Sequence, residues 1–198
     1  MCIRDRQRIS HITSNYIKAG CSIDEIPVGD FFAPSQLDFT HGSYLYIDGT
    51  YYAYLLVPSD GYKSEVPAGW LSLLVNAGDG IDLDVFLTRQ PKDRMIRKLG
   101  QQLRINRSKI KETSDTNTDF DDLDSAIRSG YFLKDGLSNH EDFYYLNLLI
   151  TVTADNPDDL DWKCAEMKKL LISQDMNVQS CNFCQEQALR SSFPLVKL

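Results

Sequence analysis

The chain has 198 residues, of which 42% are hydrophobic and 25% are charged, and its formal net charge is -7. A chain of this length and composition can bury a core of ordinary size, which excludes the disordered, collagen-like and disulfide-scaffold classes. The acidic balance argues against general affinity for nucleic acid, although it leaves room for a local basic surface.

Two features of the sequence bear on where the protein works. No apolar run approaches the roughly 18 residues that a membrane-spanning helix needs. The first residues, M-C-I-R-D-R-Q-R, lack the apolar stretch of a signal peptide. We therefore expect a protein of a reducing compartment, in which the five cysteines are thiols.

The N-terminal residues 1–29 carry only a weak helical pattern. This pattern breaks up at three positions that favour turns, Gly20, Pro27 and Gly29. We interpret the segment as an N-terminal arm that is partly disordered or non-native.

The first strong pattern is a tyrosine-rich hairpin at residues 43–57. Asp48 and Gly49 separate two tyrosine-rich runs, which is typical of a two-residue type I′ turn. Pairing Ile47 with Thr50 gives the hairpin two faces that are both apolar. We therefore expect this tyrosine hairpin to be covered on both sides.

A short apolar run, a strand and a long helix are predicted next. Residues 69–75, G-W-L-S-L-L-V, predict a short buried element, and the alternation in residues 81–88 predicts a strand with one face in the core. The residues expected to face inward are Ile81, Leu83, Val85 and Leu87. Pro91 then opens a helix whose apolar positions recur every three or four residues. These positions are Met95, Leu99, Leu103, Asn106 or Arg107, and Ile110.

A second helix follows a polar interruption at residues 113–117. Thr118 and Asp121 have the spacing of a capping box at its start. Its buried stripe is expected to consist of Phe120, Leu123, Ile127 and Tyr131.

The last third of the chain predicts a strand, a helix and a strand. Residues 143–154 form a nearly continuous apolar run, which is typical of a central strand. Asn156 and Pro157 predict a helix N-terminus, and residues 176–183 a final strand. We expect an α+β two-layer domain with helices packed on one face of a mostly antiparallel sheet, made of the tyrosine hairpin and three further strands. The expected organisation is an N-terminal arm at 1–29, an interaction domain at 30–184 and a connector at 185–198.

The sequence lacks the common catalytic motifs. Neither G-x-x-x-x-G-K-[ST] nor G-x-G-x-x-G occurs, and H-E-x-x-H and G-x-S-x-G are also missing. Cys181-x-x-Cys184 has the spacing of metal ligands but lacks the second pair that a structural zinc site needs, so we interpret it as packing. We expect the histidines to be solvated polar residues of loops or of the arm: His11, His41 and His140.

Two pairs of carboxylates have a spacing that acid-base catalysis or metal binding could use. They are Asp82 with Asp84 and Asp158 with Asp159. The wet face of a strand and the first turn of a helix explain these pairs without such a role. We therefore expect a non-catalytic module, not an enzyme, with no metal and no cofactor in this chain.

The helix after Pro91 is strongly basic. Residues 92–112 contain eight Lys or Arg and only two acids. Such a helix suits phosphates or anionic lipid headgroups. In the competing interpretation, the acidic stretch that follows folds alongside the helix and neutralises it. The acids of that stretch are Asp115, Asp119, Asp121, Asp122 and Asp124.

Several segments, taken in order, resemble a known family. They are D-F-F-A-P-S (30–35), Y-L-Y-I-D-G-T-Y-Y (44–52), G-W-L-S (69–72), I-D-L-D-V-F-L (81–87) followed by Pro91, the long central strand, N-P-D-D-L (156–160) and Q-E-Q-A-L-R-S-S-F-P-L (185–195). Together they resemble the N-terminal domain of the large conjugation ATPases of type IV secretion systems, the TraC/TrbE-like group. The resemblance covers residues 28–195, and the sequence stops where the ATPase domain of that family begins.

The resemblance implies a cytoplasmic protein, peripheral at the inner face of the plasma membrane, that docks on inner-membrane subunits of a DNA-transfer channel. It also implies self-association and contact with the chain's own ATPase domain, to which ATP and Mg²⁺ would belong. The candidate contact residues are Trp70, Arg94, Arg97, Lys98, Arg104, Arg107, Lys109 and Lys111. An alternative from another class stays open: a free-standing nucleic-acid-binding α+β module that uses the basic helix 92–111.

Overall fold

The structure is a computed structural model of the chain. It describes residues 13–20, 22, 24, 26–27, 34, 36–62, 66, 68–112 and 118–193. Much of the predicted N-terminal arm, the interruption at 113–117 and the last five residues thus lie outside the described residues. Within the predicted arm, residues 13–18 are helical.

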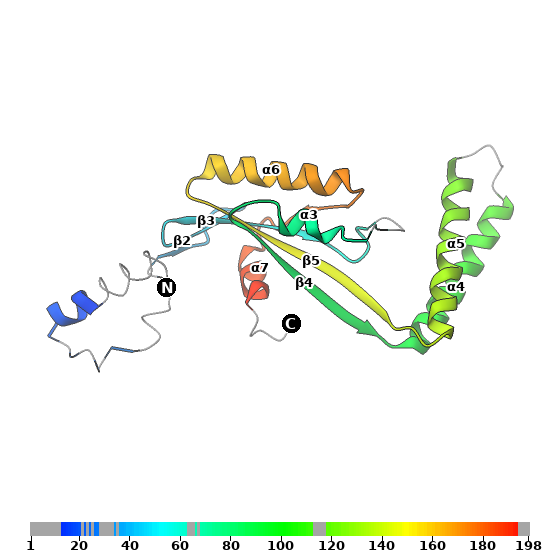
Figure 1. Cartoon of the computed structure of the whole chain (residues 1–198), viewed down its shortest axis with the longest axis horizontal. Coiled ribbons are helices and arrows are strands. Elements are labelled where there is room, and N and C mark those ends of the chain that lie inside the picture. The colour runs from blue at the N-terminus through cyan, green and yellow to red at the C-terminus, as the bar shows by residue number, and fades with distance from the viewer. Residues whose placement is uncertain are drawn as a thin grey trace.

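An antiparallel sheet organises the described part of the chain (Figure 1). Its strands are β1 (Leu37–Asp38), β2 (Leu45–Ile47), β3 (Thr50–Val57), β4 (Ile81–Gln90), β5 (Phe143–Ala154) and β6 (Gln179–Ser180). The helices are α3 (Leu71–Val75), α4 (Lys92–Glu112), α5 (Thr118–Ser138), α6 (Pro157–Ser173) and α7 (Gln185–Ser192). The strand order is β1-β2-β3-β5-β4, and β6 pairs with β3. The predicted α+β domain with an antiparallel sheet is confirmed.

The tyrosine hairpin forms with the predicted register. β2 and β3 pair with Ile47 opposite Thr50. Asp48 and Gly49 both have positive φ, at 46° and 91°, as a type I′ turn requires. Alternate residues of β3 enter a core cluster on each side of the sheet, so both faces of the hairpin are covered as expected.

β5 is the central strand, but it extends further than its neighbour β3. β3 pairs with residues 148–154 of β5, whereas β4 pairs with residues 143–152. Residues 86–90 and 143–147 therefore leave the sheet as a two-stranded β4–β5 ribbon (Figure 1). The prediction that Val85 and Leu87 face a core is wrong, since their side chains are 42% and 63% exposed. They lie where the sheet narrows toward the ribbon.

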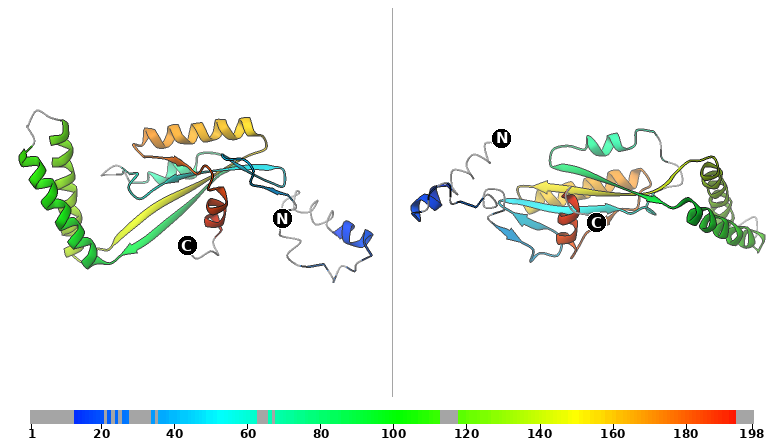
Figure 2. Two further views of the ribbon diagram at one scale, coloured as in Figure 1. Left: turned by 180° about the vertical axis from the view of Figure 1, so that it is seen from behind. Right: turned by 90° about the horizontal axis from the view of Figure 1, so that it is seen from below.

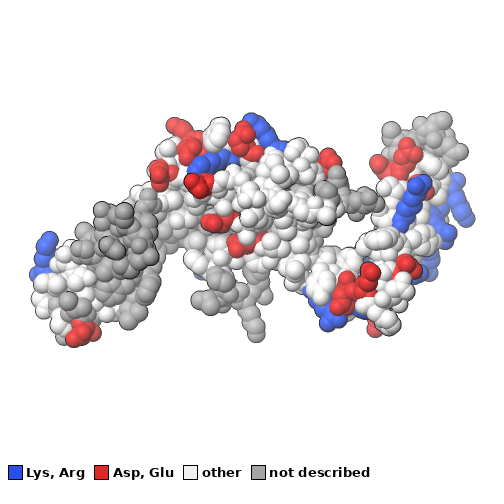
Figure 3. All heavy atoms as spheres, viewed as in Figure 1, with Lys and Arg blue, Asp and Glu red and all other residues white. Residues whose placement is uncertain are grey.

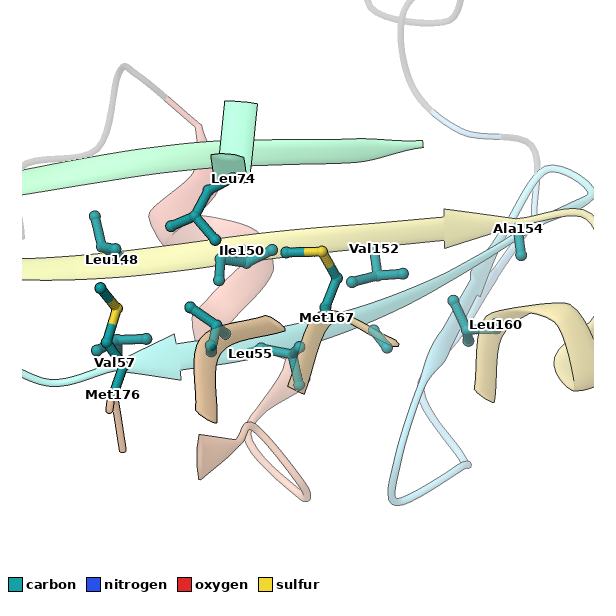
Figure 4. Close-up of a cluster of buried hydrophobic side chains, with 12 residues drawn as sticks. Leu55, Val57, Leu74, Leu148, Ile150, Val152, Ala154, Leu160, Met167 and Met176 are labelled. Atoms are coloured by element: carbon teal, nitrogen blue, oxygen red, sulfur yellow. The ribbon is translucent and has the colours of Figure 1, made fainter. Parts of the chain in front are cut away.

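The main core lies between the sheet and α6, with α3 beside it. α6 begins where predicted, because the Asn156 side chain accepts a hydrogen bond from the backbone N–H of Asp159 at 2.8 Å, and Pro157 follows. Figure 4 shows side chains of α6, α3, β3 and β5 meeting in this cluster. The least exposed are Leu55, Val57, Leu74, Leu148, Ile150, Val152, Leu160 and Leu171.

Two short elements differ from their predictions. The run predicted to be a buried element forms α3, in which only Leu74 is buried, because a helix of five residues turns Leu73 and Val75 outward. The predicted strand over 176–183 shrinks to the two residues of β6. The chain has positive φ, which is incompatible with extended backbone, at Asp175, just before the predicted strand, and at Phe183, its last residue.

The helices take three places around the sheet. α6 covers one face, as predicted, with α3 on the same side, whereas α7 packs on the opposite face (Figure 2). On that face Ala188 of α7 is buried against Leu45, Tyr54 and Leu149. α4 and α5 pack against each other at the end of the ribbon and form the α4–α5 hairpin.

The α4–α5 hairpin has a thin core of its own. Met95, Leu103 and Leu137 are buried, and a Cβ on Gly130 of α5 would lie 2.9 Å from a methyl carbon of Leu103. Tyr131, which we expected in the buried stripe, is 41% exposed, so that prediction is wrong; Gly130 lets the helices approach beside it. The two core clusters of the sheet include no described residue of this hairpin.

Candidate functional site

The α4–α5 hairpin projects from the sheet. Both Figure 1 and Figure 2 show it at the far end of the β4–β5 ribbon, clear of α6 and α7. The basic helix predicted from the sequence is α4, so most of the predicted contact residues are carried on this projection.

One carboxylate joins the ribbon to the first turn of α4. Asp142 accepts a hydrogen bond from Arg89 Nη2 at 2.9 Å and lies 3.5 Å from Lys92 Nζ. The hydrogen bond from Arg89 holds the pKa of Asp142 below its ordinary value. Because these side chains are solvated, the pairs orient the hairpin more than they stabilise it.

A second contact fixes the base of the hairpin to β5. Lys98 Nζ donates a hydrogen bond to the hydroxyl of Tyr145 at 3.2 Å. The Tyr145 ring meets the Phe143 ring edge-on, with centroids 5.6 Å apart, and its hydroxyl lies 4.0 Å from the sulfur of the buried Met95. Lys98, which we predicted to be a contact residue, is therefore engaged within the chain.

A basic stripe runs along α4 on the side opposite its buried residues. It consists of Arg94, Arg97, Arg104 and Lys111, which are spaced by three and then seven residues and are all exposed. Among the residues that the structure describes, no carboxylate forms an ion pair with any of the four. Figure 3 shows Lys and Arg gathered along the outer edge of the hairpin.

α5, which carries most of the acidic stretch, packs against α4 as the competing interpretation expects, but no ion pair joins it to this stripe within the described residues. Asp124 pairs with Arg128, one turn further along α5, and Asp122 is exposed. Asp115 and the side chain of Asp119 lie outside the described residues. The predicted contact residue Arg107 places its guanidinium 5.3 Å from the centroid of the Tyr131 ring. Lys109 is exposed.

Trp70 lies apart from the basic residues. It immediately precedes α3, and its ring meets the ring of Tyr62 edge-on with centroids 5.6 Å apart. Both side chains are half-buried and pack against the main core. The candidate contact residues therefore do not form one surface: Trp70 packs against the main core next to α3, and the others belong to α4.

The structure also contains a groove that the sequence analysis did not predict. The sheet groove has a volume of about 860 Å³ and lies on the face that α7 partly covers. Its lining residues include Ile47, Tyr52, Tyr54, Asp82, Asp84 and Thr151 from the strands, and Leu189, Ser192 and Phe193 from α7 and the residue after it. Apolar walls with a few convergent polar groups are typical of ligand sites.

A row of three polar side chains crosses the groove from strand to strand. Tyr54 of β3 is the register partner of Thr151 of β5, which in turn is the register partner of Asp82 of β4. Tyr54 and Thr151 are 2% and 6% exposed, and within the described structure neither hydroxyl has a hydrogen-bond partner. The Ser192 hydroxyl donates to the carbonyl of Leu189 at 2.8 Å, and it lies near enough to Tyr54 to offset part of the effect of burial on the pKa of that tyrosine.

The environment of this row shifts two pKa values. Burial raises the pKa of Tyr54, and burial followed by the charge of Asp82 raises the pKa of Asp84. Among the described residues, neither Asp82 nor Asp84 has a basic partner. The alternation in β4 already indicated one polar face for these acids, but only the sheet register places the buried hydroxyls beside them.

The cysteines and histidines do not form a reactive site in the described part of the chain. Burial, with a smaller contribution from Cys184, raises the pKa of the Cys181 thiol to about 12, so it is protonated and poorly nucleophilic at neutral pH. Cys184 immediately precedes α7. The His41 ring stacks on Tyr44, and His140 is exposed. His11 lies outside the described residues, among which no cluster of metal-ligating side chains occurs.

Comparison of the chain with protein-family models, curated proteins and solved structures finds no match. Among the described residues, no helix has the length and apolar character needed to cross a membrane.

Proposed function

We propose that this chain is a non-catalytic docking and assembly domain, the N-terminal interaction domain of a conjugation ATPase of a type IV secretion system. The observation that carries the docking role is the α4–α5 hairpin, which projects on a two-stranded ribbon and bears a basic stripe that forms no ion pair within the described residues. The hairpin would contact inner-membrane subunits of the DNA-transfer channel from the cytoplasmic side. ATP and Mg²⁺ would belong to a following ATPase domain of the same protein.

The distribution of buried residues supports a separate role for the hairpin. Both core clusters of the sheet are complete without it, and it keeps its own thin core around Leu103 and Gly130. Projecting elements that add nothing to the main core are available for binding. The junction at Asp142 and the contact between Lys98 and Tyr145 would hold the hairpin at a defined angle, so that a partner meets a prepared surface.

Removal of the hairpin tests this proposal directly. Leu87 and Leu146 are register partners, so replacing residues 88–145 with Asn-Gly would join β4 and β5 through a two-residue turn directly after this pair. We expect the shortened chain to retain the sheet and to lose binding to purified inner-membrane subunits of a conjugation apparatus, each tested alone by pull-down. Binding that survives the deletion would contradict the role given to the hairpin.

A matched pair of charge reversals tests the basic stripe. Arg97→Glu with Arg104→Glu should abolish binding, whereas Lys168→Glu with Lys169→Glu, the same charge change on α6, should leave it intact. In the same preparation, ATP hydrolysis by this chain alone should be undetectable. Measurable turnover would contradict the assignment as a non-catalytic domain.

The basic stripe also favours a second candidate function, nucleic-acid binding by a free-standing module. If the four basic residues contacted phosphates, the logarithm of the DNA-binding constant would fall with the logarithm of the salt concentration, with a slope of about -3 to -4. We expect titration with single- and double-stranded DNA to give no such slope if the hairpin docks on protein. Micromolar binding with that slope, lost in the Arg97→Glu, Arg104→Glu variant, would favour the nucleic-acid module instead.

A further inference from the structure

We propose that the sheet groove binds a small organic cation, a primary ammonium group on an aliphatic chain. In this site the row formed by Tyr54, Thr151 and Asp82, with Asp84 beside it, receives the ammonium group. The neighbouring apolar residues contact the methylene chain. This site is independent of the α4–α5 hairpin and of the docking function.

The two buried hydroxyls are the first reason for a ligand here. Polar groups inside proteins are almost always hydrogen-bonded, and an unpartnered one destabilises the fold. Tyr54 and Thr151 are register partners on adjacent strands, and both line the groove. Their Cβ atoms therefore lie on the order of 5 Å apart, close enough for one ligand group to reach both hydroxyls.

The carboxylates beside the hydroxyls determine that the ligand carries a positive charge. Asp82 and Asp84 are two residues apart on β4, so their side chains leave the same face of the strand and both line the groove. Burial disfavours the charged form of Asp84, and Asp82 adds to this effect. A cation bound beside Asp84 would favour its charged form and offset both influences, whereas an anion would add to them.

The chemistry of an ammonium group matches this set of acceptors. An ammonium group has three N–H donors and no acceptor. A carboxylate and the two hydroxyl oxygens can take these three donors, and the Tyr52 and Tyr54 rings that line the groove can add cation–π attraction. The side chains of Ile47, Leu189 and Phe193 offer apolar surface to methylene groups, which a hydrated metal ion would not use.

The size of the groove favours a free ligand over the side chain of a partner protein. A volume of about 860 Å³ is within the range of roughly 300 to 1,000 Å³ found for small-molecule sites. It accommodates a diamine or polyamine whole. The site therefore takes an aliphatic diamine or polyamine as a free molecule.

Calorimetric titration of the full chain with cadaverine tests the proposal, with 1,5-pentanediol as the uncharged control of equal chain length. We expect saturable binding of the diamine and none of the diol. Asp82→Asn and Asp84→Asn should each weaken binding by tenfold or more. Asp158→Asn, the same change on an exposed acid of α6, should leave binding unchanged.

Thr151→Val tests the role of the buried hydroxyl without changing any charge in the groove. Removing the unpartnered hydroxyl should leave the free protein at least as stable, while reducing the rise in Tm that cadaverine causes. No saturable binding of the diamine would overturn the proposal, and so would equal binding by the Asp82→Asn and Asp84→Asn variants. Binding of a lysine-containing peptide in place of the diamine would overturn the assignment to a free ligand.

Discussion

The sheet and the α4–α5 hairpin differ in how their residues are held. The sheet joins residues far apart in the chain, such as Leu55 of β3 with Ile150 of β5, and its faces are packed by α6 and α7. The hairpin joins two consecutive helices through a narrow stripe and leaves its basic side exposed. This difference indicates that stability resides in the sheet, whereas the hairpin can be altered without unfolding it.

A cavity in the main core should cause the largest loss in the free energy of unfolding. Ile150→Ala removes a side chain that is fully buried between β3, β4 and α6. We expect a loss of about 2 to 5 kcal/mol in the free energy of unfolding, measured by urea denaturation. Leu87→Ala, at an exposed position of the next strand, is the control and should change it by less than about 0.5 kcal/mol.

A cavity in the hairpin should have a smaller and more local effect. Leu103→Ala removes the side chain that contacts Gly130, at a site that is 5% exposed. We expect a loss of about 2 kcal/mol, at the low end for such changes, because the adjacent helix can close part of the space. Hydrogen exchange should accelerate in α4 and α5 and stay unchanged in residues 148–154 of β5. Uniform acceleration across the chain would show that the two regions unfold as one.

The start of α6 offers a test of local sequence signals within the sheet region. Asn156→Ala removes the hydrogen bond to the N–H of Asp159 and should lower the free energy of unfolding by about 1 kcal/mol. Asn156→Asp, which preserves the acceptor and adds a charge favourable to the helix dipole, should retain it. Equal losses in the two variants would contradict the capping role.

Asp84→Asn should cause the smallest change in the free energy of unfolding. We expect it to stabilise the protein, whereas the substitutions of Ile150, Leu103 and Asn156 by alanine destabilise it. Burial raises the pKa of Asp84 in the folded protein above its value in the unfolded chain, so the folded state holds this proton more tightly. The resulting stability is fully present below the unfolded pKa and is lost as pH rises through the folded pKa. At pH 7 Asp84→Asn should therefore raise the free energy of unfolding, by less than about 1 kcal/mol because the side chain is partly solvated.

The same variant separates stability from binding in the groove. Denaturation of Asp84→Asn and of the unmodified chain should show the gain at pH 7 and its disappearance near pH 3, where both chains are uncharged at this position. A variant that is less stable than the unmodified chain at pH 7 would contradict the raised pKa. Weaker cadaverine binding by a more stable protein would identify Asp84 as a residue of the site.

Local signals in the sequence predicted most of the regular elements. Asp48-Gly49 specified the type I′ hairpin and its register, because few residues tolerate positive φ. Asn156 and Pro157 marked the start of α6, and the apolar run 143–154 matched β5. The turn signal and the helix-start signal each act within a few residues, so they do not depend on which other element packs nearby.

Other predictions failed because they depended on distant neighbours. Leu87 has the alternation of a buried strand residue, but it lies on the β4–β5 ribbon, beyond the end of the pairing with β3, and is 63% exposed. Residues 69–75 have the apolar character of a core segment, yet most of α3 faces outward. Apolar periodicity identifies a face of an element and carries no information on whether another element covers it.

The sequence by itself determined where strands, turns and helices begin, the basic character of α4 and the polar face of β4, since these follow from backbone preferences and side-chain periodicity. Only the tertiary structure decided that α4 and α5 project from the sheet, that Trp70 lies apart from the basic stripe, and that Tyr54, Thr151 and Asp82 share one row. These three residues come from strands separated in the chain, and the register of long-range pairing is what brings them together.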